Sequence, residues 1–545
     1  MKKLSVLLVA ALAVASWSQT DADYHRNNVR LLKHIDLASL PGAPSAGSGC
    51  AGYVSPSGKE YAIMGQSNGN AVYNLTNPQN PTLVGHIPGP NSSWHEVCTL
   101  GQYAYACTEA GGGIQIIDLT QVDSGTVTLG NLYTDNNNLS RGHTVQAVPS
   151  KNMVVVHGGD VNGLRAYNCT NPLNPTPAGN WMGKYVHDAV YHKYTSGPYA
   201  GKTVCFAFCG NGSNGGLYVL DMDNVGANGQ FVQLGTLNYY QNAQGTGPTN
   251  FYSHSGSLSA DEHYIYANDE LDEANGLTQA GRTITFIIDV QNLATPTKIG
   301  TFSNPINVID HNSMIQDGFL MLSAYRAGMR VYNLANPTAL TESGYFDTWP
   351  QTDSSQLGTD PEGSGYAFNG DWGVWANFPS GIAILSDINR GMFIVDPSEA
   401  KLLGAPITGV TFAGANSVGD GVTLLRKDDG QEFETFARSG KGDMVVSFQT
   451  DSLAKSKVDV RFRTRCVLEG SDKAVVWIKN QVTGNWDLIA DWMLTANEAE
   501  YSVLNLDGTQ YVSSTNTIDV KVGMRTTNTR GVKIFTDMLR AYVHN

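Results

Sequence analysis

Five histidines stand at the start of strand-forming stretches at wide intervals along the chain. They are His95 in SSWHEVC, His143 in RGHTV, His187 in YVHDAV, His254 in YSHSG and His311 in IDHNS. Imidazole nitrogens bind zinc and other divalent transition metals, and they transfer protons near neutral pH. The recurrence therefore predicts one shared site, provided that the fold brings the five strands together.

Carboxylates accompany these histidines, either directly beside them or in the acidic stretch NDELDEANGLTQAGR (268–282). Imidazole with carboxylate suits zinc and related metals, whereas carboxylates with carbonyl oxygens suit calcium. The predicted metal ligands are His187, Asp188, His311 and Asp310. Asp188 and Glu270 are candidate general bases. Further residues are expected to bind a ligand at this site, the arginines by clamping an anion. They are His95, His143, His254, Asp269, Arg326, Trp372 and Arg390.

A repeated phrase supplies the elements that would position these residues. Each copy is a run of β-branched or aromatic residues closed by Asn or Asp, then a turn, as in NAVYNLTNP and GMRVYNLANP. The closing residues are Asn74, Asp118, Asn168, Asp221, Asp289, Asn333 and Asp396, at spacings of 44, 50, 53, 68, 44 and 63. A four-stranded propeller blade needs about 40–50 residues, so the repeat predicts a seven-bladed β-propeller. The alternative is a pair of β-sandwiches with chance similarity.

The last copy lacks a fourth strand, and the orphan stretch VRLLKHIDL (29–37) resembles the missing one. An N-terminal strand in the last blade would close the ring and remove exposed sheet edges. In such a ring the first strands line a central channel, and their starts meet the loops between second and third strands at one mouth. We therefore expect the histidines and the acidic stretch to meet there. The alternative is that each histidine only hydrogen-bonds between strands, as in other propeller repeats.

The motifs WHEV, YVHDA, NDELDE, IDHN, GYFDTWP and FPSGIAILSDINRGMFIVD, with the LVIVD-like third strands, make the chain similar to the secreted bacterial choice-of-anchor B proteins. The resemblance covers roughly 30–400. It implies a seven-bladed propeller over 24–403 that is exported to the cell surface or the medium. It implies no particular activity, because that family has no well-established one.

Residues 404–545 lose the repeat and show alternating stretches such as KVDVRFRTRCVL and TIDVKVGM. Alternation of this kind predicts a β-sandwich or jelly-roll, a fold that many glycan-binding and anchoring modules share. Trp477, Trp486 and Trp492 would either stack on sugars or pack in the sandwich core, and core packing is the simpler interpretation.

The N-terminus, MKKLSVLLVAALAVASWSQT, has two lysines, a short apolar run and small residues. It predicts a signal peptide over 1–18 and an exported protein. The chain has a net charge of −14, which argues against nucleic acid and anionic membranes as partners. Among its seven cysteines, Cys98 and Cys107 flank a predicted hairpin and are the best candidates for a disulfide.

Two functions fit these observations. The first is a secreted or cell-surface binding protein that holds an extracellular small molecule, glycan or envelope component on its histidine-bearing face, with or without a divalent metal. The second is a metal-dependent extracellular hydrolase or lyase with its site at the channel mouth, which additionally needs an open metal position and a base.

Overall fold

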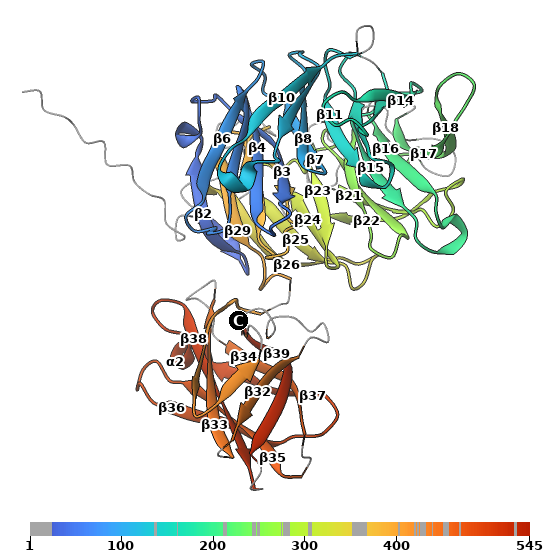
Figure 1. Cartoon of the computed structure of the whole chain (residues 1–545). Coiled ribbons are helices and arrows are strands. Elements are labelled where there is room, and N and C mark those ends of the chain that lie inside the picture. The colour runs from blue at the N-terminus through green and yellow to red at the C-terminus, as the bar shows by residue number, and fades with distance from the viewer. Residues whose placement is uncertain are drawn as a thin grey trace, which may run out of the picture.

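The computed structural model (Figure 1) is nearly all-β, as the sequence predicted. It describes residues 24–135, 139–160, 162–210, 215–241, 247, 251–273, 275, 284–303, 308–350, 368–401, 404–418, 421, 425, 432–438, 440–450, 457–467, 470–527 and 531–544. The predicted signal peptide lies outside them. Among these residues, none belongs to a helix that is both long and apolar enough to cross a membrane.

Residues 24–396 form seven antiparallel sheets of four or five strands. The first is β3 (Gly47–Val54), β4 (Glu60–Gln66), β5 (Gly69–Asn74) and β6 (Thr82–Pro88). The second is β7 (His95–Leu100), β8 (Tyr103–Thr108), β9 (Ile114–Asp118) and β10 (Thr128–Tyr133). The third is β11 (Thr144–Val148), β12 (Met153–His157), β13 (Leu164–Asn168) and β14 (Thr176–Trp181). The fourth is β15 (Asp188–Lys193), β16 (Thr203–Cys209), β17 (Gly216–Val225) and β18 (Phe231–Leu237).

The remaining three sheets follow the same order. The fifth is β19 (Ser253–Leu258), β20 (Tyr264–Asp269), β21 (Ile284–Asp289) and β22 (Thr297–Ser303). The sixth is β23 (Ser313–Gln316), β24 (Phe319–Ser323), β25 (Met329–Asn333) and β26 (Thr341–Pro350), extended by β1 (Tyr24–Asn27). The seventh is β27 (Asp371–Trp375), β28 (Ala383–Asp387), β29 (Gly391–Asp396) and β2 (Arg30–Asp36). Short 3-10 turns lie at Leu37–Ser39, Val122–Ser124, Pro149–Lys151 and Gly197–Tyr199.

The seven sheets form a closed, propeller-like ring. Each first strand contacts the first strand of the next sheet, in the order β3, β7, β11, β15, β19, β23, β27, and β27 contacts β3 again. The N-terminal strand β2 pairs with β29, at the place that the sequence predicted for it. The ring thus begins and ends in one sheet, and it brings the starts of distant first strands to one mouth.

The repeated Asn or Asp has a physical explanation. At all seven closing positions the side-chain oxygen accepts a hydrogen bond from the backbone N–H two residues later, as Asn74 does from Thr76 and Asp118 from Thr120. This side-chain turn satisfies a backbone donor next to the strand. The sequence signature therefore marks the turn from the third strand to the fourth in the first six sheets, and the end of β29 in the seventh.

Residues 404–544 form two five-stranded antiparallel sheets (orange to red in Figure 1). The first is β30 (Ile407–Ala413), β33 (Lys441–Gln449), β38 (Thr517–Thr526), β35 (Asp472–Lys479) and β36 (Trp486–Met493). The second is β31 (Asn416–Val418), β32 (Phe433–Ala437), β39 (Val532–His544), β34 (Lys457–Cys466) and β37 (Ala499–Asp507), with a short helix α2 (Gly508–Tyr511) after it. The sheets share one apolar core, because alternate residues of β34, β35 and β38 point inward.

Two expectations need correction. Cys98 and Cys107 are both free thiols, and Cys98 lies opposite Tyr105 while Cys107 lies opposite Glu96, so the proposed Cys98–Cys107 disulfide is wrong. Core packing holds for Trp492, which stacks near Phe462, but Trp477 and Trp486 lie on the outer face of their sheet.

Candidate functional site

A ring of side chains, called the rim here, surrounds the channel at the starts of the first strands. Every sheet contributes one position to it. The rim consists of Gly49, Glu96, His143, His187, His254, His311 and Trp372. Four of the five predicted histidines and the predicted Trp372 therefore come together.

The five aromatic rings of the rim form an unbroken row. The ring centroids of His143 and His187 lie 4.3 Å apart, and those of His187 and His254 lie 3.9 Å apart. His254 and His311 follow at 4.3 Å, and His311 and Trp372 at 4.6 Å. The row then passes to Glu96, whose Oε1 accepts a 2.6 Å hydrogen bond from Trp372 Nε1. A side chain at position 49 would clash with Glu96, since a Cβ there would lie 2.2 Å from Oε2.

His95 is the exception among the five histidines. It is buried at the same kind of strand start, but its Nε2 donates a 2.7 Å hydrogen bond to the carbonyl of Pro90. It does not line the central cavity, and the next residue, Glu96, takes the place in the rim. The interpretation of these histidines as strand-to-strand scaffolding thus describes His95, while the other four make different contacts.

Proton positions in the rim follow from the partners of each nitrogen. His187 Nδ1 lies 3.1 Å from the His254 carbonyl and must donate, so His187 Nε2 has a free lone pair. His143 Nε2, 2.7 Å from that lone pair, must donate as well. His143 Nδ1 lies 2.6 Å from Glu109, and its hydrogen bond holds the pKa of that carboxyl below its usual value. His143 thus lies between the Glu109 carboxylate and the ring of His187.

His311 and Glu270 face each other as two acceptors. His311 Nδ1 donates to the carbonyl of Trp372 at 2.5 Å, which leaves a lone pair on Nε2, 3.6 Å from Glu270 Oε1. Burial lowers the pKa of His311 to about 3, so this ring stays neutral. Glu270 is held by the hydroxyl of Tyr325 at 2.6 Å, and burial raises its pKa. A cation between the two acceptors would turn an unfavourable contact into a favourable one.

His254 is fully buried, and neither of its ring nitrogens has a hydrogen-bond partner. Its Nε2 lies 3.7 Å from Glu270 Oε2. Burial holds the pKa of His254 well below its usual value; the backbone of His311 opposes that shift, although it is not in hydrogen-bonding geometry. His187, His254 and Glu270 each offer a ligand atom within 4.8 Å of the others. A buried imidazole without a hydrogen-bond partner lowers the stability of the fold, so we expect His254 to bind a partner such as a metal ion.

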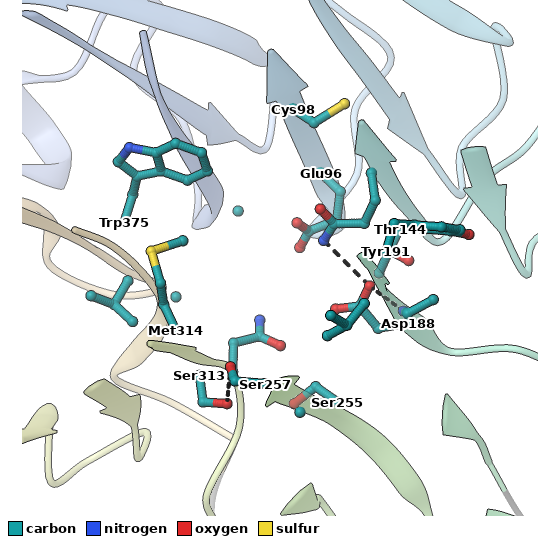
Figure 2. A pocket seen from close by; sticks show the side chains of 18 of the residues that line it. Glu96, Cys98, Thr144, Asp188, Tyr191, Ser255, Ser257, Ser313, Met314 and Trp375 are labelled. Atoms are coloured by element: carbon teal, nitrogen blue, oxygen red, sulfur yellow. Dashed lines mark hydrogen bonds between the residues drawn. The ribbon is translucent and has the colours of Figure 1, made fainter. Parts of the chain in front are cut away.

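A cavity of about 540 Å³ runs along the channel beside the rim. Figure 2 shows Glu96, Thr144 and Asp188 on one side of it, Met314 and Trp375 on the opposite side, and Ser257 with Ser313 below them. Burial raises the pKa of Glu96 to about 7 and that of Asp188 to about 6. Asp188 accepts hydrogen bonds from its neighbour's backbone N–H at 2.7 Å and from Gln146 at 3.3 Å. The cavity has both polar and apolar contacts for an organic ligand.

Other predicted site residues lie elsewhere. The guanidinium groups of Arg326 and Arg390 stack on Trp349, 4.9 and 4.1 Å from the ring centroid, and neither lines the cavity. Asp269 is bound by the Tyr240 hydroxyl and by two backbone N–H groups. Asp310 is held by Asn268 Nδ2 at 2.8 Å and joins a separate acidic group with Asp272 and Glu273. The four predicted metal ligands therefore do not form one set.

Some residues of the site were missed in the sequence. Tyr325 binds Glu270, and a hydrogen bond of 3.0 Å joins Ser257 to Ser313 inside the channel. Tyr325 has a positive φ of 36°, a rare backbone conformation for a bulky residue. The pattern YRAG (325–328) contains no feature that distinguishes it from an ordinary turn.

No family model matches the sequence, and no curated protein matches it either. Among solved structures, the chain is similar to Sqt1 from Saccharomyces cerevisiae, with a TM-score of 0.39 and 11% identity over 68% of this chain and 97% of that one. An exo-β-1,3-galactanase from Phanerochaete chrysosporium, solved with β-1,3-galactotriose, has a TM-score of 0.30 and 8% identity over 84% and 97%. The protein TmCBM61, solved with β-1,4-galactotriose, has a TM-score of 0.19 and 13% identity over 25% and 90%. All three TM-scores are below 0.5, so these similarities indicate no function for this chain.

Proposed function

We propose that this chain is an exported binding protein, a seven-bladed propeller followed by a β-sandwich, whose rim holds a divalent transition metal. The observation that carries the proposal is His254, buried with both nitrogens unpartnered beside Glu270. Nitrogen donors with one carboxylate favour zinc, copper or iron over calcium. The resemblance to choice-of-anchor B proteins supports export and display at a surface, and the channel cavity supports an organic ligand next to the metal.

The proposed ligands are His187 Nε2, His254 Nε2, His311 Nε2 and Glu270. Zinc holds nitrogen ligands at about 2.0–2.1 Å, so neighbouring ligand atoms lie about 3.3 Å apart. The observed separations are close to that value, 3.7 Å from His254 Nε2 to Glu270 Oε2 and 3.6 Å from His311 Nε2 to the other oxygen, Oε1. The His187 lone pair is occupied by the proton of His143. Metal binding at His187 Nε2 would therefore displace this hydrogen bond.

The test is elemental analysis of the full chain, purified without a histidine tag or chelator. We expect about one equivalent of a transition metal in the wild type and its loss in His254→Ala and Glu270→Gln. His192→Ala is the matched control, because His192 is partly exposed and paired with Glu262 at 2.7 Å, away from the rim. A wild type that takes up no transition metal after soaking and desalting contradicts the proposal.

A second candidate function, a metal-dependent hydrolase or lyase, is favoured by Asp188. Its carboxyl lines the same cavity as His187 and has a pKa raised to about 6 by burial, which suits a general base near neutral pH. If this function holds, Asp188→Asn retains the metal and loses turnover of an ester or glycan substrate. A metal-loaded wild type that is inert towards such substrates leaves binding as the function.

The outer face of β35, β36 and β38 is the proposed glycan contact. Lys521 lies 4.5 Å from the Trp477 ring centroid and 4.7 Å from that of Trp486. Gly523 lies beneath Trp477, since a Cβ there would be 2.6 Å from the indole. The indole thus lies against the sheet with Lys521 and Arg525 over its ring, and together they form the aromatic and cationic surface proposed to contact a glycan. Trp477→Ala should abolish binding on a glycan array, whereas Val482→Ala, an exposed residue of a neighbouring turn, should not.

A further inference from the structure

A second group of ionisable side chains lies on the other side of the segment that carries His311. It consists of Asp272 and Glu273, from the connection after β20, and Asp310, from the segment before β23. Their exposed fractions are 1%, 2% and 0%. Each offers a carboxylate oxygen within 4.8 Å of the others. The group therefore concentrates three carboxylates from two sheets in a place without access to water.

Most oxygens of this group lack a well-aligned donor. Both oxygens of Asp272, both of Glu273 and Oδ1 of Asp310 have none in hydrogen-bonding geometry, and Asp272 and Glu273 interact chiefly with each other and with the Glu273 backbone N–H. One neutral neighbour is Asn268, whose Nδ2 donates to Asp310 Oδ2 at 2.8 Å and to Thr285 Oγ1 at 3.2 Å. The amide oxygen of Asn268 is itself buried and unpartnered. No lysine or arginine in the described part of the chain forms an ion pair with the three carboxylates.

Three buried carboxylates at this separation cannot all carry charge unless a cation neutralises them. Without a cation, the three carboxyls must hold protons in its place. Calcium binds oxygen ligands at 2.3–2.6 Å, so ligands on opposite sides of the ion lie up to about 5 Å apart. The separation within 4.8 Å fits that sphere.

We propose that Asp272, Glu273 and Asp310, with the amide oxygen of Asn268, bind one hard divalent cation of the calcium class. All donors are oxygens, which favours calcium over zinc. The cation would tie the connection after β20 to the segment before β23, and so join the fifth sheet to the sixth. Because Glu270 lies in that same connection, the cation would also position the carboxylate that faces His254 and His311.

The test is calcium binding to the chelator-treated full chain, followed by calorimetry and by terbium luminescence. We expect one saturable calcium site, a rise in Tm with calcium concentration, and at least a tenfold loss of affinity in Glu273→Gln and in Asp310→Asn. His254→Ala, which removes a rim ligand, should leave calcium affinity unchanged, so this site and the transition-metal site can fail separately.

The carboxyls could instead remain protonated and share protons. A wild type that binds neither calcium, manganese, magnesium nor terbium, and whose Tm is insensitive to all of them, overturns the proposal. So does a Glu273→Gln variant that folds, binds calcium as well as the wild type and has the higher Tm in chelator. If either variant fails to fold, the calcium titration of the wild type still decides between the two outcomes.

Discussion

The rim and the acidic group meet at the adjacent residues Asp310 and His311, yet they differ in the type of donor that each residue adds. On one side His311 adds a nitrogen to a row of imidazoles, and on the other Asp310 adds an oxygen to buried carboxylates. Two adjacent residues can thus serve two sites of unlike chemistry. A metal site in this ring can therefore be predicted only after each side chain has been assigned to the rim or to the acidic group.

The sharpest way to break this comparison is to change the two neighbours separately. His311→Gln should lower zinc affinity by about 100-fold and leave calcium affinity unchanged, because it removes a nitrogen donor. Asp310→Asn should do the reverse. Isothermal titration of each variant with both metals measures the four affinities. If either variant weakens both metals equally, the two groups form a single site.

The pH dependence of the unfolding free energy of the metal-free protein tests the rim separately from the acidic group. Burial raises the folded-state pKa of Glu96 to about 7 from its usual value of 4.5. A raised acid pKa means that the folded protein binds the proton more tightly, so stability increases as pH falls from about 7 towards 4.5. Glu96→Gln, which keeps an acceptor for Trp372, should remove about 3 kcal/mol of this pH dependence. Urea unfolding at several pH values measures it, and an unchanged profile would show that Glu96 is ionised in the fold.

Removing the hydroxyl of Tyr325 should weaken metal binding at the rim and leave the acidic group unaffected. The hydroxyl holds Glu270 Oε1 at 2.6 Å, and loss of a group that orients a metal ligand costs about tenfold in affinity or more. Tyr325→Phe should therefore weaken zinc binding about tenfold and leave calcium binding intact. Competition with a fluorescent zinc chelator provides the measurement. Equal loss of calcium would mean that Tyr325 supports the whole connection after β20.

The smallest expected effect is that of His95→Ala, which sets the baseline for a purely structural histidine. The variant leaves the Pro90 carbonyl without its donor and should cost about 1–3 kcal/mol of stability. Neither metal should bind differently. Denaturant unfolding and metal analysis of the same preparation test both statements, and a loss of zinc would place His95 in the rim after all.

Much of the fold could be predicted from the sequence. The closing Asn and Asp residues located the turns, since each makes a local hydrogen bond two residues along the chain. The strand Arg30–Asp36 was found from its likeness to other fourth strands. The sequence did not allow us to predict which site residues lie together. Arg326 and Arg390 were expected at the channel mouth, but both guanidinium groups stack on Trp349, which lies outside the repeated phrase.

The sequence by itself determined that the chain is all-β, where the repeated strands end, and that histidines from several sheets would approach one another. These properties depend on local hydrogen bonds and on side-chain period, which a linear pattern records. Only the tertiary structure decided that Glu96 replaces His95 in the rim, that Glu270 faces His254, and that Asp310 turns to Asp272 and Glu273. Those choices depend on which buried polar group finds a partner across sheets, and that is a property of packing between residues far apart in the chain.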